Sequence, residues 1–249
     1  MTPEKFIAKW KSSKLKETAS SHEHFLDLCH LLEEPTPAEL DPDGVWYTFE
    51  KGVNKTMGSK GWADVWKRHH FGWEYKGKGK DLKKAFVQLQ QYAIALENPP
   101  LLVVCDIDTI IIHTNFTNTI EEIHIVTLDD IAHFDSRQKL KWLFSQPEKL
   151  KPTVTREAVT QKVAQEFVSL AQQLRAQNYE AYQVAHFINQ LVFCMFAEDI
   201  GLLPNNIFTR LLETVEKRPE SFIPMIQDLF AAMRIGGTFG VEADRKSVV

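Results

Sequence analysis

Hydrophobic residues follow a helical period at the start of the chain and a strand period after it. An apolar stripe predicts a helix over residues 13–33, and a proline-rich loop follows it. Residues 45–50 are rich in aromatic and β-branched side chains, which predicts a first strand. Two more strands, 61–68 and 72–79, are expected to form a hairpin that turns near His69.

A second helix is predicted after this hairpin. Asp81 is a suitable N-cap, apolar residues recur at helical spacing as far as Leu96, and Asn98-Pro-Pro ends the pattern. Two short apolar strands, 101–105 and 109–114, should then pair with each other. The order of helix, three strands, helix and further strands predicts an α+β fold, with a mixed sheet flanked by helices.

The second half of the chain shows helical periodicity only. Four helices are expected, at about 155–174, 179–200, 206–217 and 220–234, and residues 146–152 resemble a linker. We find no cluster of nucleophiles or bases in these helices, so this half is interpreted as a scaffold. The predicted parts are an α+β domain over 1–145, a helical domain over 153–241, and a tail over 242–249 that is expected to be disordered or truncated.

Composition describes an ordinary globular protein. The chain has 249 residues, of which 44% are hydrophobic, and its three cysteines are far apart in apolar surroundings. Such cysteines fit reduced packing residues better than disulfides or a zinc site. The N-terminus has no apolar leader, and polar residues interrupt the most hydrophobic stretch. We therefore expect a cytoplasmic protein with no membrane partner.

Charge is distributed unevenly along the chain. The net charge is −4, yet residues 51–84 hold ten lysines or arginines against three acids, namely Asp64, Glu74 and Asp81. A basic segment built around two carboxylates is typical of a phosphate-binding surface near a metal site. A solvated lysine-rich strand and turn explains the same charges about equally well.

The chemistry of this segment rests on three residues in a D-x9-E-x-K pattern. Side chains alternate along a strand, so Glu74 and Lys76 should project to one face, and the hairpin should place Asp64 opposite Glu74. Two carboxylates at that spacing, with the backbone carbonyl of Tyr75, would suit Mg2+, or Mn2+ in its place. Lys76 would orient water or stabilise charge in the transition state. The triplet alone is weak evidence, because nucleases tolerate many spacings.

Four other titratable residues give no clear indication of a functional site. His22 and His24 lie two apart on a predicted helix, and a surface role is expected for them rather than metal binding. Glu198 and Asp199 lie near a helix C-terminus, where the helix dipole disfavours anions. Either a basic partner or simple solvation would explain these two acids.

The pattern, together with Gln88 and Tyr92 in Gln88-Leu-Gln-Gln-Tyr92, resembles the PD-(D/E)XK nuclease superfamily, whose RecB-like branch carries a Q-x-x-x-Y element. The chain more closely resembles the N-terminal part of MmeI-type restriction-modification enzymes over about residues 13–241. Besides the D-x9-E-x-K pattern, three segments carry this resemblance: Ser21–Cys29, Leu96–Val104 and Phe196–Pro204.

This resemblance implies an endonuclease domain and a helical spacer. In the family both belong to a polypeptide that also carries an adenine-specific DNA methyltransferase, which uses S-adenosylmethionine, and a target recognition domain. We expect no S-adenosylmethionine site in this chain itself. The resemblance gives Asp64 and Glu74 the role of Mg2+ ligands, Lys76 the role of completing the site, and Gln88 and Tyr92 the role of supporting residues near the DNA. Strand alternation would also place Lys78 and Lys80 on one face with Lys76, so these two lysines of the basic segment are predicted to lie near the DNA as well.

Two questions stay open at this point. A further acid from the first helix, Glu17 or Glu23, is a candidate ligand in nucleases of this kind. The expected function is Mg2+-dependent cleavage of double-stranded DNA, and the alternative is a catalytically silent fragment that contacts DNA or docks a methyltransferase.

Overall fold

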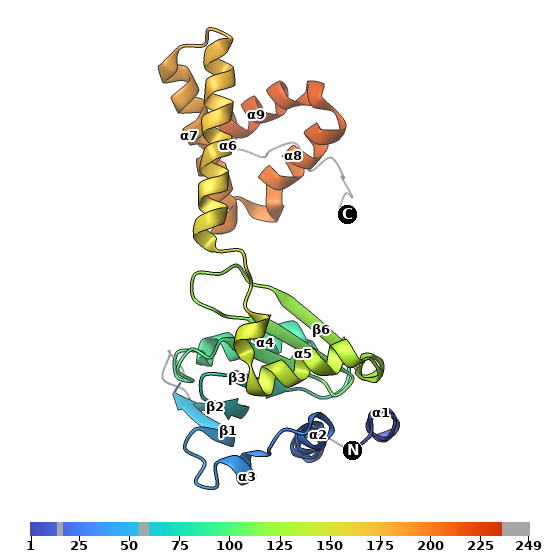
Figure 1. Ribbon diagram of the computed structural model, residues 1–249. Coiled ribbons are helices and arrows are strands. Elements are labelled where there is room, and N and C mark those ends of the chain that lie inside the picture. The colour runs from blue at the N-terminus through green and yellow to red at the C-terminus, as the bar shows by residue number, and fades with distance from the viewer. Residues whose placement is uncertain (14–16, 55–59, 236–249) are drawn as a thin grey trace. The chain divides into compact units, whose positions relative to one another are not determined.

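The computed structural model describes residues 1–13, 17–54 and 60–235, and within them it holds a six-stranded mixed sheet with helices around it (Figure 1). The chain divides into two compact units, residues 1–160 and the residues from 161 onward. The predicted α+β class, with a helical C-terminal region, is confirmed. No helix in these described residues is long and apolar enough to span a membrane.

The sheet follows the order of the sequence. Neighbouring strands are antiparallel except β3 and β4, which are parallel and are joined by a crossover through α4. The β2–β3 turn contains His69 at φ 61° and is closed by a 3.0 Å bond from His70 N to Lys67 O. The strands are β1 (Tyr47–Asn54), β2 (Lys60–Lys67), β3 (Phe71–Tyr75), β4 (Leu101–Cys105), β5 (Thr109–Thr114) and β6 (Ile123–Thr127).

Helices cover the two faces of the sheet unequally. One face packs into the larger core with α1 (Pro3–Ser12), α2 (Glu17–Leu32) and α5 (Phe134–Ser145). The other face packs into a smaller core under α4 (Leu82–Tyr92). The short helix α3 (Pro37–Leu40) leads into β1. Odd-numbered residues of β3 therefore face the larger core, and even-numbered ones face α4.

The helix predicted over 13–33 corresponds to α2, which begins at Glu17 and ends at Leu32, and the preceding helix α1 was not predicted. Asp81 does cap α4, since its side chain accepts bonds from the N–H groups of Lys83 and Lys84. The predicted linker is packed, because Pro147 and Leu150 are buried.

The second unit is helical, as expected. A core formed by its helices includes Leu191, Phe208 and Leu229. Gly201, at φ 76°, follows the end of α7 in the left-handed conformation that glycine adopts without strain. The helices are α6 (Arg156–Ala176), α7 (Ala181–Asp199), α8 (Ile207–Lys217) and α9 (Phe222–Ile235). The predicted tail, 242–249, lies outside the described residues.

Candidate active site

Asp64 is fixed at the point where β2 and β3 separate. The register of the two strands pairs Val65 with Trp73, so Asp64 and Glu74 are the next opposing positions. The Asp64 carboxylate accepts a 2.6 Å hydrogen bond from the backbone N–H of Tyr75 through its Oδ2 atom. A side-chain oxygen thus occupies the place that a strand carbonyl would otherwise take, which brings the Asp64 carboxylate next to β3.

Glu74 and Lys76 lie on the same side of β3, as predicted from strand alternation. The Lys76 ammonium is 2.7 Å from Oε1 of Glu74. The Glu74 side chain is 4% exposed and that of Lys76 is 25% exposed. The buried anion is therefore neutralised by a cation that still reaches solvent, and such pairing offsets the cost of removing a carboxylate from water.

Gln88 on α4 makes a second contact to Glu74. Its Nε2 atom donates to the same Oε1 atom at 3.0 Å. The amide and the ammonium together restrict the rotation of the carboxylate, which is the task of supporting residues around a reactive group. Tyr92, one turn further along α4, is buried in the smaller core, and its proximity to DNA stays a prediction.

Gly72 lets α4 approach β3 closely enough for these contacts. A Cβ atom at this position would stand 2.9 Å from Cδ1 of Leu96 and 3.5 Å from Cδ1 of Leu89. The Trp66 indole N–H also donates to the carbonyl of Leu96 at 2.9 Å. A larger residue at position 72 would displace the tip of the Leu96 side chain, which follows α4 in the chain.

Lys78 and Lys80 do not continue the face of Lys76. That prediction is wrong, because β3 ends at Tyr75 and the following residues form a loop. The Lys78 ammonium donates to the carbonyl of Trp10 and to Asp108, each at 2.8 Å. Lys80 is exposed. A contact between either lysine and DNA stays a prediction.

The opposite face of β3 holds a residue that the sequence pattern misjudged. His24 was expected at the surface, yet it is fully buried, and its Nδ1 atom lies 2.8 Å from the hydroxyl of Tyr75. Burial lowers the pKa of His24 to about 3, with smaller effects from Lys78 and Lys9. The imidazole is therefore neutral at neutral pH and supports β3 from behind. Two histidines two apart on a helix face different directions, and periodicity did not show which of them was buried.

The acids of α2 have other contacts or are not described. The Glu23 carboxylate lies 2.6 Å from the ammonium of Lys9, which is also 2.6 Å from Asp27. Hydrogen bonds to these two acids raise the pKa of Lys9. The side chain of Glu17 lies outside the described residues. A role for either glutamate as a ligand stays a prediction.

Several cations of the basic segment support the fold. The Lys67 ammonium is buried and donates to the carbonyl of Phe144 at 2.7 Å, and its burial lowers its pKa. Arg68 pairs with Glu97 at 2.8 Å. Lys55 lies outside the described residues. The net charge of the segment therefore overstates the number of cations available to a phosphate backbone.

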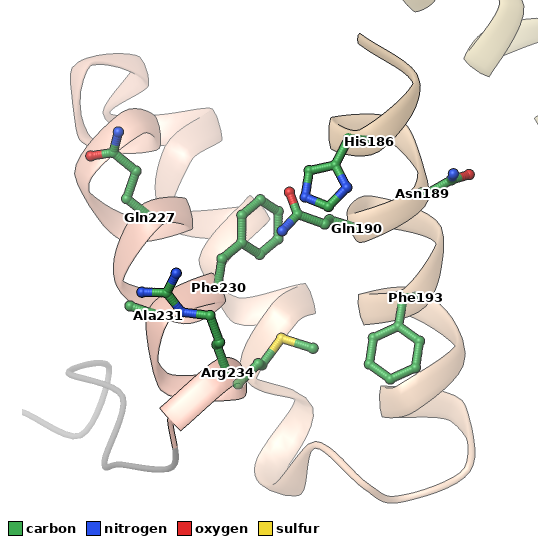
Figure 2. Close-up of a pocket in the computed structure, with 9 residues that line it drawn as sticks. His186, Asn189, Gln190, Phe193, Gln227, Phe230, Ala231 and Arg234 are labelled. Atoms are coloured by element: carbon green, nitrogen blue, oxygen red, sulfur yellow. The ribbon is translucent and has the colours of Figure 1, made fainter. Parts of the chain in front are cut away.

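The helical unit contains a groove between α7 and α9, with a volume of about 730 Å3. Figure 2 shows Phe230 and Arg234 on α9 across from His186 and Gln190 on α7. The described lining residues include no carboxylate and no serine or cysteine. No acid or nucleophile therefore lines this groove among the described residues, and the scaffold role of this half stays a prediction.

Glu198 has a structural partner in this unit. Its carboxylate accepts a 2.7 Å bond from the N–H of Phe208, and it also accepts from the N–H and hydroxyl of Thr209, at the start of α8. A carboxylate at a helix N-terminus is favoured by the helix dipole. Neither a basic partner nor simple solvation is needed to explain this residue.

Two family models match successive parts of the chain. The model for the N-terminal domain of MmeI matches residues 1–177, and the model for the MmeI helicase spacer domain matches residues 182–247. The chain belongs to the MmeI family. The resemblance to MmeI-type enzymes is thus confirmed, and membership places the chain among MmeI-type restriction-modification enzymes. No curated protein and no solved structure matches it.

Proposed function

We propose that this member of the MmeI family carries a Mg2+-dependent DNA endonuclease site of PD-(D/E)XK type, which hydrolyses phosphodiester bonds of double-stranded DNA. One observation carries the proposal: the Lys76 ammonium and the Gln88 amide converge on Oε1 of the buried Glu74. Asp64 is held at the adjoining strand. A carboxylate pair with a cation beside it is the minimum that such hydrolysis needs.

The donor set fits a hard divalent cation. Asp64 and Glu74 supply carboxylate oxygens from adjacent strands, and Mg2+ prefers oxygen ligands while keeping several waters. Among the described residues, no group of three or more His, Cys, Asp or Glu forms a metal cluster. The remaining ligands would be a carbonyl such as that of Tyr75, phosphate oxygens and water. When bound, the cation supplies Lewis-acid activation of the phosphodiester and of water, and Mn2+ would serve in its place.

Lys76 has the position for electrostatic stabilisation. Its side chain is 25% exposed, so its ammonium could face a phosphate while it stays close to Glu74. A fixed cation stabilises the negative charge that develops on phosphate oxygens in the transition state. Gln88 acts as a positioning residue, because it contacts Glu74 and holds its carboxylate in one orientation.

Partners follow from the family. Double-stranded DNA is the proposed substrate, and exposed cations near the site, such as Lys80 and Lys83, would contact its phosphates. Sequence choice would come from a methyltransferase domain and a target recognition domain, and S-adenosylmethionine would be bound there. The residues described around Glu74 are proposed to act in hydrolysis only, and no role in binding S-adenosylmethionine is proposed for them.

Plasmid nicking with Mg2+ or Mn2+ tests the proposal. Glu74→Gln and Lys76→Ala should abolish cleavage, and EDTA should abolish it in the unaltered chain. Glu97→Gln is the matched control, because it makes the same chemical change in an exposed ion pair outside the site. Equal cleavage by the unaltered chain and by Glu74→Gln would refute the assignment.

If the chain does not cleave DNA by itself, metal binding distinguishes a nuclease site from a catalytically silent fragment. Calorimetric titration with Mn2+ should show a site that Asp64→Ala and Glu74→Gln remove and that Glu97→Gln retains. The alternative, a catalytically silent docking fragment, is favoured by the fact that Glu74 is already paired with Lys76. Absence of both cleavage and Mn2+ binding in the folded, unaltered chain would establish that alternative.

A further inference from the structure

One oxygen of Glu74, Oε1, accepts two hydrogen bonds from other side chains. The Lys76 ammonium lies 2.7 Å from this atom, and the Gln88 amide donates to it at 3.0 Å. A carboxylate oxygen has two lone pairs, and these two donors use both of them. A divalent cation bound at Oε1 would therefore need the place of one donor.

The second oxygen of Glu74, Oε2, is shielded from solvent. Mg2+ keeps several waters when it binds to a protein, so a hydrated cation does not fit at a shielded atom. The Glu74 side chain is 4% exposed, whereas that of Lys76 is 25% exposed. A cation that arrives from solvent therefore meets the carboxylate on the side where Lys76 lies.

The two donors at Oε1 differ in charge and in freedom of movement. The Gln88 amide is neutral, so its bond to one lone pair is compatible with a cation on the other. The Lys76 ammonium carries a positive charge and would repel a cation at the same oxygen. Its flexible four-carbon side chain lets the ammonium leave Glu74 without any movement of β3.

We propose that Lys76 competes with the divalent cation for Oε1 of Glu74 and thereby controls how tightly the site binds metal. Lys76 acts as the internal counterion of Glu74, and Gln88 holds the carboxylate in both arrangements. A Lys76 ammonium that has left Oε1 can pair with a phosphate oxygen of the substrate instead. This inference rests on the proposed metal site and describes the regulation of that site.

The charges of the site favour such an exchange. The carboxylates of Asp64 and Glu74 balance one divalent cation completely. An ammonium held against the same carboxylates would then add an uncompensated charge beside the buried Glu74, and buried charges without a partner are costly. If the site is instead catalytically silent, the pair of Lys76 and Glu74 is permanent, so the two possibilities predict different metal affinities for variants of Lys76.

Calorimetric titration with Mn2+ tests the competition. Lys76→Met removes the charge and keeps a long side chain. It should bind Mn2+ at least about tenfold more tightly than the unaltered chain, which is the lower end of the coupling between close charge pairs. Lys78→Met is the matched control, because Lys78 also forms an ion pair at 2.8 Å, with Asp108, and is 32% exposed. The Mn2+ affinity of this control should equal that of the unaltered chain.

Two results would overturn the competition. One is an affinity for Mn2+ that Lys76→Met leaves equal or weakens, and the other is an equal gain in Lys78→Met, which would indicate a general effect of charge. Absence of Mn2+ binding in all of these folded proteins would remove the proposed metal site together with the inference. Binding that Glu74→Gln abolishes and Lys76→Met does not strengthen would remove the competition alone.

Gln88 gives a contrast at the same oxygen atom. Gln88→Ala removes the neutral donor that orients the carboxylate, so it should weaken Mn2+ binding, whereas Lys76→Met should strengthen it. Two residues that merely hold Glu74 in place would change the affinity in the same direction when removed. Changes of the same sign in the two variants would therefore contradict the proposal.

Thermal unfolding separates the competition from a structural role of Lys76. Without added metal, Lys76→Met should unfold at a lower temperature than the unaltered chain, because the buried Glu74 carboxylate loses the charge of Lys76. Saturating Mn2+ should narrow this difference, because the carboxylate is then balanced by the bound cation. Lys76→Arg keeps the charge and should gain no affinity. A difference in unfolding temperature that Mn2+ leaves unchanged would argue for a structural role.

A measurement on the unaltered chain does not depend on the folding of any variant. Acetylation of the Lys76 amine, followed by mass spectrometry of peptides, should increase when Mn2+ is added, because Lys76 leaves Glu74. Acetylation of Lys78 should stay constant in the same sample and provides the internal control. Unchanged acetylation of Lys76, in a sample in which calorimetry shows bound Mn2+, would refute the exchange.

Discussion

The Asp64 carboxylate lies 2.6 Å from the backbone N–H of Tyr75. This bond ties the first acid of the D-x9-E-x-K pattern to the strand that carries the second. One side chain thus completes the sheet at the β2–β3 junction, and in the proposed site it would also serve as a metal ligand. The structural and chemical roles of Asp64 can be separated by substitution.

Asp64→Ala should lower the free energy of unfolding by about 1–3 kcal/mol, because the Tyr75 N–H loses its acceptor. Asp64→Asn keeps an amide oxygen, and a neutral acceptor bonds about half as strongly, so its loss should be roughly half as large. Urea denaturation measures both values. Mn2+ titration should show loss of metal binding in both variants. Retention of tight metal binding by a folded Asp64→Asn would argue against its role as a ligand.

Gln88→Ala should weaken Mn2+ binding or cleavage by about 10- to 100-fold, the range for residues that orient a metal-binding carboxylate. Unfolding free energy should change little, because Gln88 lies partly exposed on α4. Gln90→Ala provides the control, since Gln90 is exposed on the same helix. If both variants behave alike, Gln88 does not position Glu74.

Burial of His24 predicts a dependence of stability on pH. The pKa of His24 is lowered to about 3 in the folded protein, so the unfolded chain binds this proton more readily. The contribution of neutral His24 to the free energy of unfolding should therefore be fully present above the unfolded pKa of about 6.5. This contribution should be lost progressively as pH falls from there toward 3. The slope for one proton is at most about 1.4 kcal/mol per pH unit.

His24→Gln should flatten this dependence, because it removes the titrating group. Urea unfolding at a series of pH values between 7 and 4 provides the measurement, with His22→Gln as the control for an exposed histidine on the same helix. An unchanged slope in His24→Gln would mean that other groups produce the acid sensitivity.

Glu198→Ala should destabilise the helical unit by about 1 kcal/mol, the usual effect of losing a side chain that caps a helix N-terminus. The bonds at risk are those from Phe208 and Thr209. Asp199→Ala should have no such effect, because Asp199 is exposed. Thermal unfolding of the two variants provides the measurement. Equal unfolding midpoints for Glu198→Ala and Asp199→Ala would exclude the capping role of Glu198.

Much of the fold follows from local patterns. The β2–β3 hairpin, the β4–β5 pair and the Asp81 cap depend on residues close together in sequence, so periodicity and capping rules predict them. Strand alternation also predicted that Glu74 and Lys76 share a side. Alternation fails beyond the end of a strand, which is why Lys78 was misplaced.

The sequence by itself determined the α+β class, the helical second unit, the acid–lysine pattern and the family resemblance. Each of these depends only on residue types and on their spacing along the chain. The tertiary structure decided that His24 is buried against Tyr75, that Lys67 reaches Phe144, and that Ile123 and Ile125 lie exposed on β6, the last strand of the sheet. These relationships join residues that are distant in sequence, or depend on which strand ends the sheet. The physical reason is that burial and partner choice are set by the packing of whole elements, and residue spacing along one element does not specify its neighbours.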